Sequence, residues 1–262
     1  MHALERLAQG NVEHRQTIVD VLCAYLRMPY DLEHTLHAPV PGRYVMFGNR
    51  LLRLPAGVSD PDAPACCVPT LEKLQEQQVR CAAQRILTDH LRPDPDESGK
   101  SRDKFWADVD LDLSGAALVE FDLSRCQVRD VKFDGARFSG PAVFAETEFT
   151  GNAWFAGATF SNPAGFRAAR FLGEAWFGWT IFSADCGFVD AYFADGAGFR
   201  AAAFLSNTWF DRAHFTGKAR FNETRFTKHP SFSGTQIDQD PPSEIPAHVA
   251  PDGHQAPDGS YH

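Results

Sequence analysis

The stretch GNAWFAGATFSNPAGFRAARFLGEAWF, residues 151–177, decides the fold. Its rings are separated by five, six, five and six residues, at Phe155, Phe160, Phe166, Phe171 and Phe177. Neither the 3.6-residue period of a helix nor the two-residue period of a strand gives this spacing. The stretch therefore indicates an internal repeat with a unit of five or six residues.

The same spacing extends over residues 113–237. Large apolar residues occupy 24 consecutive positions, five apart up to residue 138 and alternately six and five apart beyond it. The position two residues before each of these is mostly small, with 13 Ala, 5 Thr and 2 Cys among the 24. Because residues two apart in a strand share a face, each large residue and its small predecessor are expected to point inward together.

Short segments of this region resemble the pentapeptide-repeat family, whose motif is A-(D/N)-(L/F)-(S/T)-x. DLSGA, ALVEF and DLSRC follow the parent form, and GATF, GARF and KARF are similar to its phenylalanine-rich form with an eleven-residue double unit. The resemblance covers the whole repeat region, about half of the chain. It implies a mainly β fold, a right-handed quadrilateral β-helix (solenoid) of about six coils.

Four repeats make one coil of 22 residues, which places specific rings above one another. Two of the expected columns are Phe155, Phe177, Phe199 and Phe221, and Phe160, Phe182, Phe204 and Phe226. Small or turn-forming residues recur near the expected corners, where a positive φ or a loose turn is easiest: Gly140, Gly151, Asn162, Gly173 and Gly217.

The chain divides into five parts. They are a helical hairpin (1–30), an irregular connection (31–69), a capping helix with a linker (70–104), the repeat (105–237) and a tail expected to be disordered (238–262). In the first part, Asn11 is the expected cap of a helix that Pro29 stops. The apolar centre of the connection, YVMFGNRLLRL, is expected to dock on the protein or to form a short hairpin. Thr70 is the expected cap of a helix that ends near Leu91.

The segment HALERLAQGNVEHRQTIVDVLCAYLR resembles one that precedes the repeats in actinobacterial pentapeptide-repeat proteins. QVRCAAQRILTDHL resembles a second segment of that region, and the pair is similar to HEAT or armadillo helical hairpins. Such relatives often carry hydrophobic spans upstream, and we expect this chain, which starts at Met1 partway through the pattern, to lack that anchor. The helices are expected to cover the open N-terminal edge of the β-helix.

Composition narrows the possible functions. The net charge of −9 argues against direct nucleic-acid binding, which needs a basic patch. The six Cys contain no CxxC pair, so a zinc site is not expected, and Cys126 and Cys186 fall on inward small positions as core residues. The sequence shows neither a signal peptide nor an apolar run long enough to span a membrane. The expected location is therefore cytoplasmic, with a peripheral membrane location implied only by the anchored relatives.

No catalytic, cofactor-binding or metal-binding constellation is expected, so we predict that the protein is not an enzyme. G-x-S-x-G, H-E-x-x-H, P-loop and G-x-G-x-x-G motifs are absent from the sequence. Asp108, Asp110 and Asp112 alternate, but no EF-hand glycine or terminal Glu follows them, so they are interpreted as the outward face of the first strand. His214 and His229 have no metal-ligand partner at helical or hairpin spacing.

Outward aromatic residues are the candidate contacts for a partner. Trp154 and Trp176 are 22 residues apart and should lie one above the other, and Tyr192 and Trp209 occupy similar positions on other faces. Exposed Trp is enriched at binding hot spots, although such rings also serve simply to cover strand backbone. The sequence leaves both interpretations open.

The predicted function is a non-enzymatic repeat scaffold that binds an unidentified protein partner. One alternative is a DNA mimic that inhibits DNA gyrase, which needs a strongly negative rod. Residues 107–150 hold 9 acidic and 4 basic residues, but residues 151–237 hold 6 and 8. A second alternative is a membrane-associated accessory protein whose anchor is missing from this chain. The partner's identity, the physiological role and the oligomeric state stay open.

Overall fold

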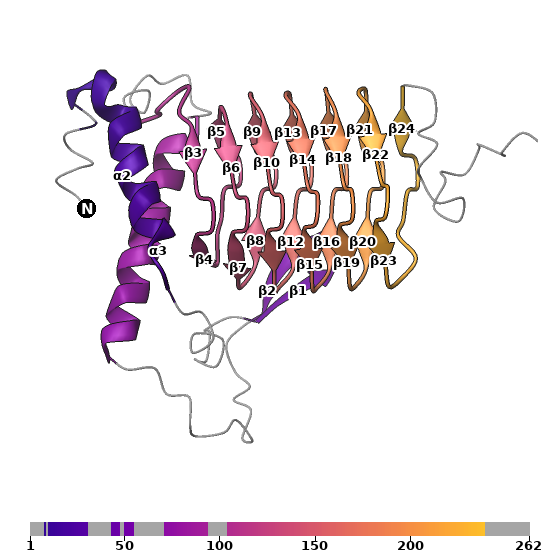
Figure 1. The fold of residues 1–262 in the computed structure, drawn as a ribbon, viewed down its shortest axis with the longest axis horizontal. Coiled ribbons are helices and arrows are strands. Elements are labelled where there is room, and N and C mark those ends of the chain that lie inside the picture. Colours follow the sequence, from indigo (N-terminus) through magenta and orange to yellow (C-terminus); the bar gives the residue numbers. More distant parts are fainter. Residues whose placement is uncertain are drawn as a thin grey trace, which may run out of the picture.

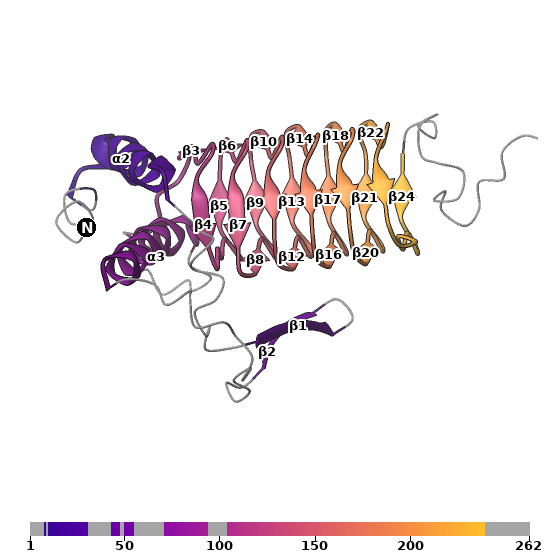
Figure 2. The same ribbon diagram turned by 60° about the horizontal axis from the view of Figure 1, so that its bottom comes forward.

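The computed structural model describes residues 8, 10–30, 43–47, 50–54, 71–93 and 104–238. Residues 111–237 wind into a four-sided parallel β-solenoid of about six coils, which forms a rod in Figure 1. Two helices lie at the N-terminal end of the rod in both ribbon views (Figures 1 and 2). The predicted β-helix with a small helical N-terminal region is therefore confirmed.

Each coil places short strands on four faces, which we number in chain order. Face 1 contains β3 (Leu111–Asp112), β6 (Val131–Lys132), β10 (Ala153–Trp154), β14 (Ala175–Trp176), β18 (Ala197–Gly198) and β22 (Ala219–Arg220). Face 2 contains β4 (Ala117–Val119), β7 (Arg137–Ser139), β11 (Thr159–Phe160), β15 (Ile181–Phe182), β19 (Ala203–Phe204) and β23 (Arg225–Phe226).

The other two faces close the coil. Face 3 contains β8 (Ala142–Val143), β12 (Ala164–Gly165), β16 (Cys186–Gly187) and β20 (Thr208–Trp209), with isolated bridges to Asp122 and Ser231 at its two ends. Face 4 contains β5 (Gln127–Val128), β9 (Glu148–Phe149), β13 (Arg170–Phe171), β17 (Tyr192–Phe193), β21 (His214–Phe215) and β24 (Gln236–Ile237).

Strands on one face pair in parallel, one coil apart. Trp154 pairs with Trp176 in the middle of the rod, and Leu111 of the first coil pairs with Val131. The first coil is thus slightly shorter than the later ones, which follows from the run of five-residue repeats before residue 138. Neighbouring coils of such a solenoid lie about 4.8 Å apart, the ordinary strand spacing.

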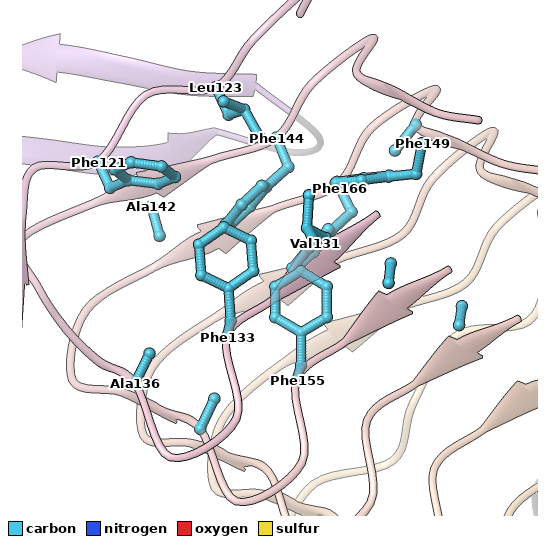
Figure 3. Packing of buried hydrophobic residues seen from close by; sticks show 14 of the residues in the cluster. Phe121, Leu123, Val131, Phe133, Ala136, Ala142, Phe144, Phe149, Phe155 and Phe166 are labelled. Carbon is cyan, nitrogen blue, oxygen red and sulfur yellow. The ribbon is translucent and has the colours of Figure 1, made fainter. Parts of the chain in front are cut away.

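Columns of stacked phenylalanine rings fill the interior. Centroids in the column that runs from Phe155 through Phe177 and Phe199 to Phe221 are 4.7, 5.0 and 4.8 Å apart, with interplanar angles of 8° or less. The column that begins at Phe160 is spaced similarly. Figure 3 shows the rings of early coils meeting in the middle of the rod. The predicted stacking is confirmed, and both predicted core cysteines, at residues 126 and 186, are buried.

Several inward small positions carry threonine rather than alanine, and their hydroxyl groups are satisfied by the backbone. Thr147 donates to the carbonyl of Leu123 at 2.7 Å, and Thr180 donates to that of Phe155 at the same distance. Both side chains are fully buried. A buried hydroxyl without a partner is costly, so these bonds explain how a polar residue substitutes for alanine inside the rod.

The corners differ from the prediction. Gly140 has the expected positive φ, +75°, but most left-handed corner positions are held by residues other than glycine, such as Glu146 and Arg212. At Gly217 the requirement is space, since an added Cβ would collide with the carbonyl group of Asp195 on the preceding coil. Close approach between corners, rather than backbone conformation, therefore explains this glycine.

The N-terminal helices pack against each other and against the first coil. The 3₁₀ turn η1 (Val12–His14) leads into α2 (Arg15–Arg27), and α3 is Leu71–Leu91. The predicted side-chain cap at Asn11 is wrong: its side chain makes no capping bond, and its backbone carbonyl accepts from His14 N–H instead. The buried face of α2 includes Ile18 and Leu22 as predicted.

The remaining described elements are two strands of the connection. β1 (Arg43–Phe47) and β2 (Arg50–Leu54) pair antiparallel, which matches the hairpin alternative for this segment. No helix among the described residues is long and apolar enough to cross a membrane. The tail expected to be disordered lies outside the described residues beyond Asp238.

Two glutamines close the N-terminal edge of the rod. Gln84 of α3, which is buried, donates its amide to the carbonyl of Val119 at 2.8 Å and accepts from Val119 N–H at 3.1 Å. Gln16 of α2 makes the same pair of bonds with Asp110, at 3.0 and 2.9 Å. Each side-chain amide thus offers the donor and acceptor that a preceding strand would offer, and it satisfies an otherwise open sheet edge.

Candidate interaction surface

The four aromatic residues predicted as partner contacts lie on three different faces. Trp154 and Trp176 are register neighbours on face 1, as predicted, but Tyr192 is on face 4 and Trp209 is on face 3. All four side chains are half-buried. The structure therefore brings the first two together and leaves the other two on separate faces.

Trp176 lies over glycine backbone. A Cβ added at Gly198, its register neighbour on the next coil, would collide with the six-membered ring of Trp176. A Cβ added at Gly178 would lie 2.7 Å from its indole nitrogen. The ring fits where these two residues have no side chain, so Trp176 covers the sheet as well as facing outward.

Trp154 and Tyr192 are each approached by a cation from an adjacent coil. The ammonium of Lys132 lies 5.8 Å from the centroid of Trp154. Tyr192 lies between the guanidinium of Arg170, 6.0 Å from its centroid, and the ring of His214 at 5.5 Å. Cation–π contacts of this kind hold a ring in place and reduce the area that is free for a partner.

A tryptophan that the sequence reasoning missed is the most exposed large apolar residue on the rod. Trp179 occupies the corner between β14 and β15, with φ of +57°, and is 54% exposed. Its ring contacts that of Trp176 edge-on at 6.5 Å, and Arg200 lies 5.9 Å from its centroid. Other corners of the rod share this left-handed conformation, but Trp179 is the aromatic residue among them.

Two further exposed apolar side chains lie on face 2 or just after it, one on the same coil and one on the next. Ile181 follows on face 2 and is 39% exposed, and Leu205, just after the paired strand β19, is 46% exposed. Among the described residues of the rod, these two and Trp179 are the large apolar side chains that are clearly exposed. We call Trp176, Trp179, Ile181 and Leu205 the Trp179 patch.

A signal for this patch exists in the sequence, although the outward strand positions do not reveal it. Corner positions recur every 22 residues, and this column reads Gly135, Gly157, Trp179, Ala201 and Glu223. A tryptophan among small or charged residues stands out once the column is aligned. Alternation along the strands does not reveal it, because corners lie outside the strands.

Opposite charges alternate along the corner between faces 3 and 4. Glu146 bonds both Arg125 and Arg167, at 3.2 and 2.7 Å, and Asp190 bonds Arg212 at 2.6 Å. The hydrogen bond from Arg212 holds the pKa of Asp190 below its usual range. This pairing of acids with arginines differs from the continuous negative surface that a DNA mimic needs.

Two of the three alternating aspartates, Asp110 and Asp112, are also paired with arginines. Asp110 accepts two bonds from Arg129, at 2.7 and 2.6 Å, and Asp112 pairs with Arg27 of α2. The Arg129 hydrogen bonds lower the pKa of Asp110. Asp112 lies on the first strand as predicted, whereas Asp108 and Asp110 precede that strand.

The inward cysteines carry no sign of reactivity. Burial raises the pKa of Cys126 to about 12 and raises that of Cys186 well above its usual range. A thiol of such pKa is almost entirely protonated at neutral pH, and the thiolate is the nucleophilic form. These two residues therefore act as small apolar core side chains.

Comparison with known proteins identifies the repeat. Residues 123–161 and 144–191 match the family described as Pentapeptide repeats (9 copies). No curated protein and no solved structure matches the chain significantly. The matched segment lies within the four-sided coil, and the same phenylalanine spacing continues on both sides of it. Residues 123–191 of the rod are therefore pentapeptide repeats.

Proposed function

We propose that the protein is a non-enzymatic scaffold that binds a protein partner through the Trp179 patch. The observation that carries this proposal is the gathering of exposed Trp179, Ile181 and Leu205 on adjacent coils. Each is at least 39% exposed, in a rod whose other large apolar side chains are mostly inside. Clustered exposed apolar residues mark interaction sites, and tryptophan is enriched at their hot spots.

The rigidity of the rod supports the same proposal. The patch rests on strands whose backbone is bonded to the coils on both sides, as in the bond from Phe177 N–H to Gly198 O at 2.6 Å. A preorganised surface loses little conformational freedom when it binds, which favours affinity. The positions predicted from the sequence keep a supporting role here, because Trp176 is the ring against which Trp179 packs.

The test compares variants that separate contact from covering. A pull-down from host lysate would use wild-type protein beside Trp179→Ser combined with Ile181→Ser, and beside Trp209→Ser as a matched control on face 3. We expect a partner retained by the wild type and the control but lost with the patch variant. Thermal unfolding checks that the patch variant remains folded, since neither side chain is buried.

The outcome against the proposal is equally definite. If every captured protein is retained by a folded Trp179→Ser, Ile181→Ser variant, the patch is not the binding surface. Trp176→Ser is a poor choice for this experiment because that ring covers Gly198, and its loss exposes sheet backbone. Its effect on stability would be confused with an effect on binding.

A further inference from the structure

Four exposed basic residues lie on two adjoining faces of the last coil. Lys218 and Arg220 lie at face 1, and Arg225 and Lys228 lie at face 2 and the corner after it. None of the four forms an ion pair with another described residue. We call these four residues the basic collar.

Most arginines on the earlier coils, in contrast, are paired with carboxylates. Six arginines of the rod each bond a carboxylate on a neighbouring coil: Arg125, Arg129, Arg167, Arg170, Arg200 and Arg212. The paired residues are 19 to 23 positions apart in the sequence, which is about one coil. Four of these carboxylates lie on the preceding coil and two on the following coil, and the collar residues have neither kind of ion-pair partner among the described residues.

The acids near the collar are already engaged. Glu223 bonds Arg200 at 3.2 Å, and Asp238 lies 2.9 Å from the ring nitrogen of His214. Asp211 accepts from the hydroxyl of Ser231 and from Ser233 N–H. Asp195 accepts from Gly196 N–H. None of these acids pairs with the collar, which therefore presents four exposed cations without an ion-pair partner among the described residues.

The chain that follows has the opposite charge. Residues 239–262 contain Asp240, Glu244, Asp252 and Asp258, and no Lys or Arg. The first of these acids stands 22 residues after Lys218, the separation at which coils of this rod pair their charges. Four negative charges in the tail thus match the four positive charges of the collar.

The point at which the tail leaves the rod favours the same contact. The last strand, β24, ends at Ile237 on face 4, and the next face in chain order is face 1, which carries Arg220. Asp240 is three residues beyond Ile237, a reach of about 10 Å in an extended chain. A short tether gives an effective concentration in the millimolar range, which makes weak charge pairs effective.

We propose that the acidic tail, residues 239–262, binds back onto the basic collar of its own chain. The contact is electrostatic and covers the open C-terminal edge beside β22 and β23. It does not depend on the Trp179 patch being a partner site. Exposed charge pairs are screened by salt, so the contact weakens as ionic strength rises.

Zero-length carbodiimide cross-linking of the full-length protein tests the proposal, because it joins a lysine amine to a carboxylate in contact with it. A dilute mixture of ¹⁴N- and ¹⁵N-labelled protein separates links within one chain from links between chains. We expect same-isotope links from Lys218 or Lys228 to the four tail acids. Lys132, on face 1 four coils earlier, should form none.

Matched variants show whether the collar charge causes the links. Arg220→Ser with Arg225→Ser keeps both collar lysines, and should lower the yield roughly two- to tenfold, as expected for the loss of one or two exposed ion pairs. Arg125→Ser with Arg167→Ser, in the first and third coils of the rod, should leave the yield unchanged. An equal yield in the collar variant would overturn the proposal, as would links found only in mixed-isotope pairs, which would assign the tail to a second copy.

A binding experiment covers the remaining alternative, that the collar is free for an external anion. Inorganic polyphosphate would be titrated into wild type and into a full-length variant with Asp240→Asn, Glu244→Gln, Asp252→Asn and Asp258→Asn. We expect the neutralised-tail variant to bind several-fold more tightly because its collar is uncovered. Equal affinity for the two proteins would mean that the tail does not occupy the collar, and would contradict the proposal.

Discussion

The two ends of the rod solve the same problem by different means. At the N-terminal end, Gln16 and Gln84 reach from helices to the first coil and pair with its backbone as a strand would. At the C-terminal end, Phe226 and Ile237 are only partly buried, and no described element lies beyond them. The N-terminal edge is closed by side-chain amides, whereas the C-terminal edge presents basic residues and partly buried apolar side chains.

This difference teaches where a solenoid needs special residues. In the middle of the rod each coil satisfies its neighbours, so a repeated pattern of small and large residues is sufficient. At an end, the same backbone needs donors and acceptors from outside the pattern. We therefore expect substitutions to have different effects in the middle, at the closed end and at the open end.

The largest effect is expected in the middle of the rod. Phe177→Ala removes a fully buried ring stacked on both sides and should lower the free energy of unfolding by about 3–5 kcal/mol. Phe226→Ala, at the open end, removes a ring that is only half-buried and should lower it by about 1–2 kcal/mol. Urea unfolding of the two variants measures the contrast. Equal losses would mean that the open end is covered as fully as the middle.

The next effect concerns the closed end. Gln84→Leu keeps the side chain's bulk but leaves the N–H and carbonyl of Val119 without partners inside the protein. Val119 is 8% exposed, so we expect a loss of about 2–4 kcal/mol. Gln16→Leu should cost less, because that side chain is half-buried and water can replace it. Unfolding curves for both variants decide the point, and a neutral Gln84→Leu would refute the role of this amide in closing the edge.

The smallest effect is a dependence on pH at the closed end. Arg129 lowers the pKa of Asp110 in the folded protein below its unfolded value near 4. The contribution of this pair is therefore complete above about pH 4 and is lost as the pH falls through the folded pKa. Asp110→Asn should flatten the dependence of the urea midpoint on pH between about 5 and 2. If the urea midpoint of the variant depended on pH as that of the wild type does, this pair would not stabilise the closed end.

Sequence reasoning predicted the repeated part of the fold well, for a physical reason. Register in a solenoid is set by which residues face inward. The size and spacing of Phe155 and Phe177 are sufficient to identify them as inward residues. The bonds of Gln84 could not be predicted in this way, because they depend on where a helix lies against the first coil. Gly217 was assigned to a corner correctly, but its reason, the closeness of Asp195, appears only when adjacent coils are placed together.

The candidate surface was predicted less completely. Alternation along the strands located Trp154 and Trp176, and their register is as expected. It did not reveal that Trp176 lies on Gly198, or that the exposed ring is Trp179 at a corner. Exposure depends on what the adjacent coil offers at the same position, which is a property of columns that run from coil to coil rather than of one strand.

The parallel register of the coils has a consequence for how such a protein changes in length. A duplication or deletion of one whole coil in the middle of the rod joins two coils that have the same arrangement of inward rings, so the new junction repeats contacts already present. Each event alters the length by one strand spacing, about 4.8 Å. The distance between the closed and open ends of the rod can therefore evolve in steps of one coil, while both ends keep their structure.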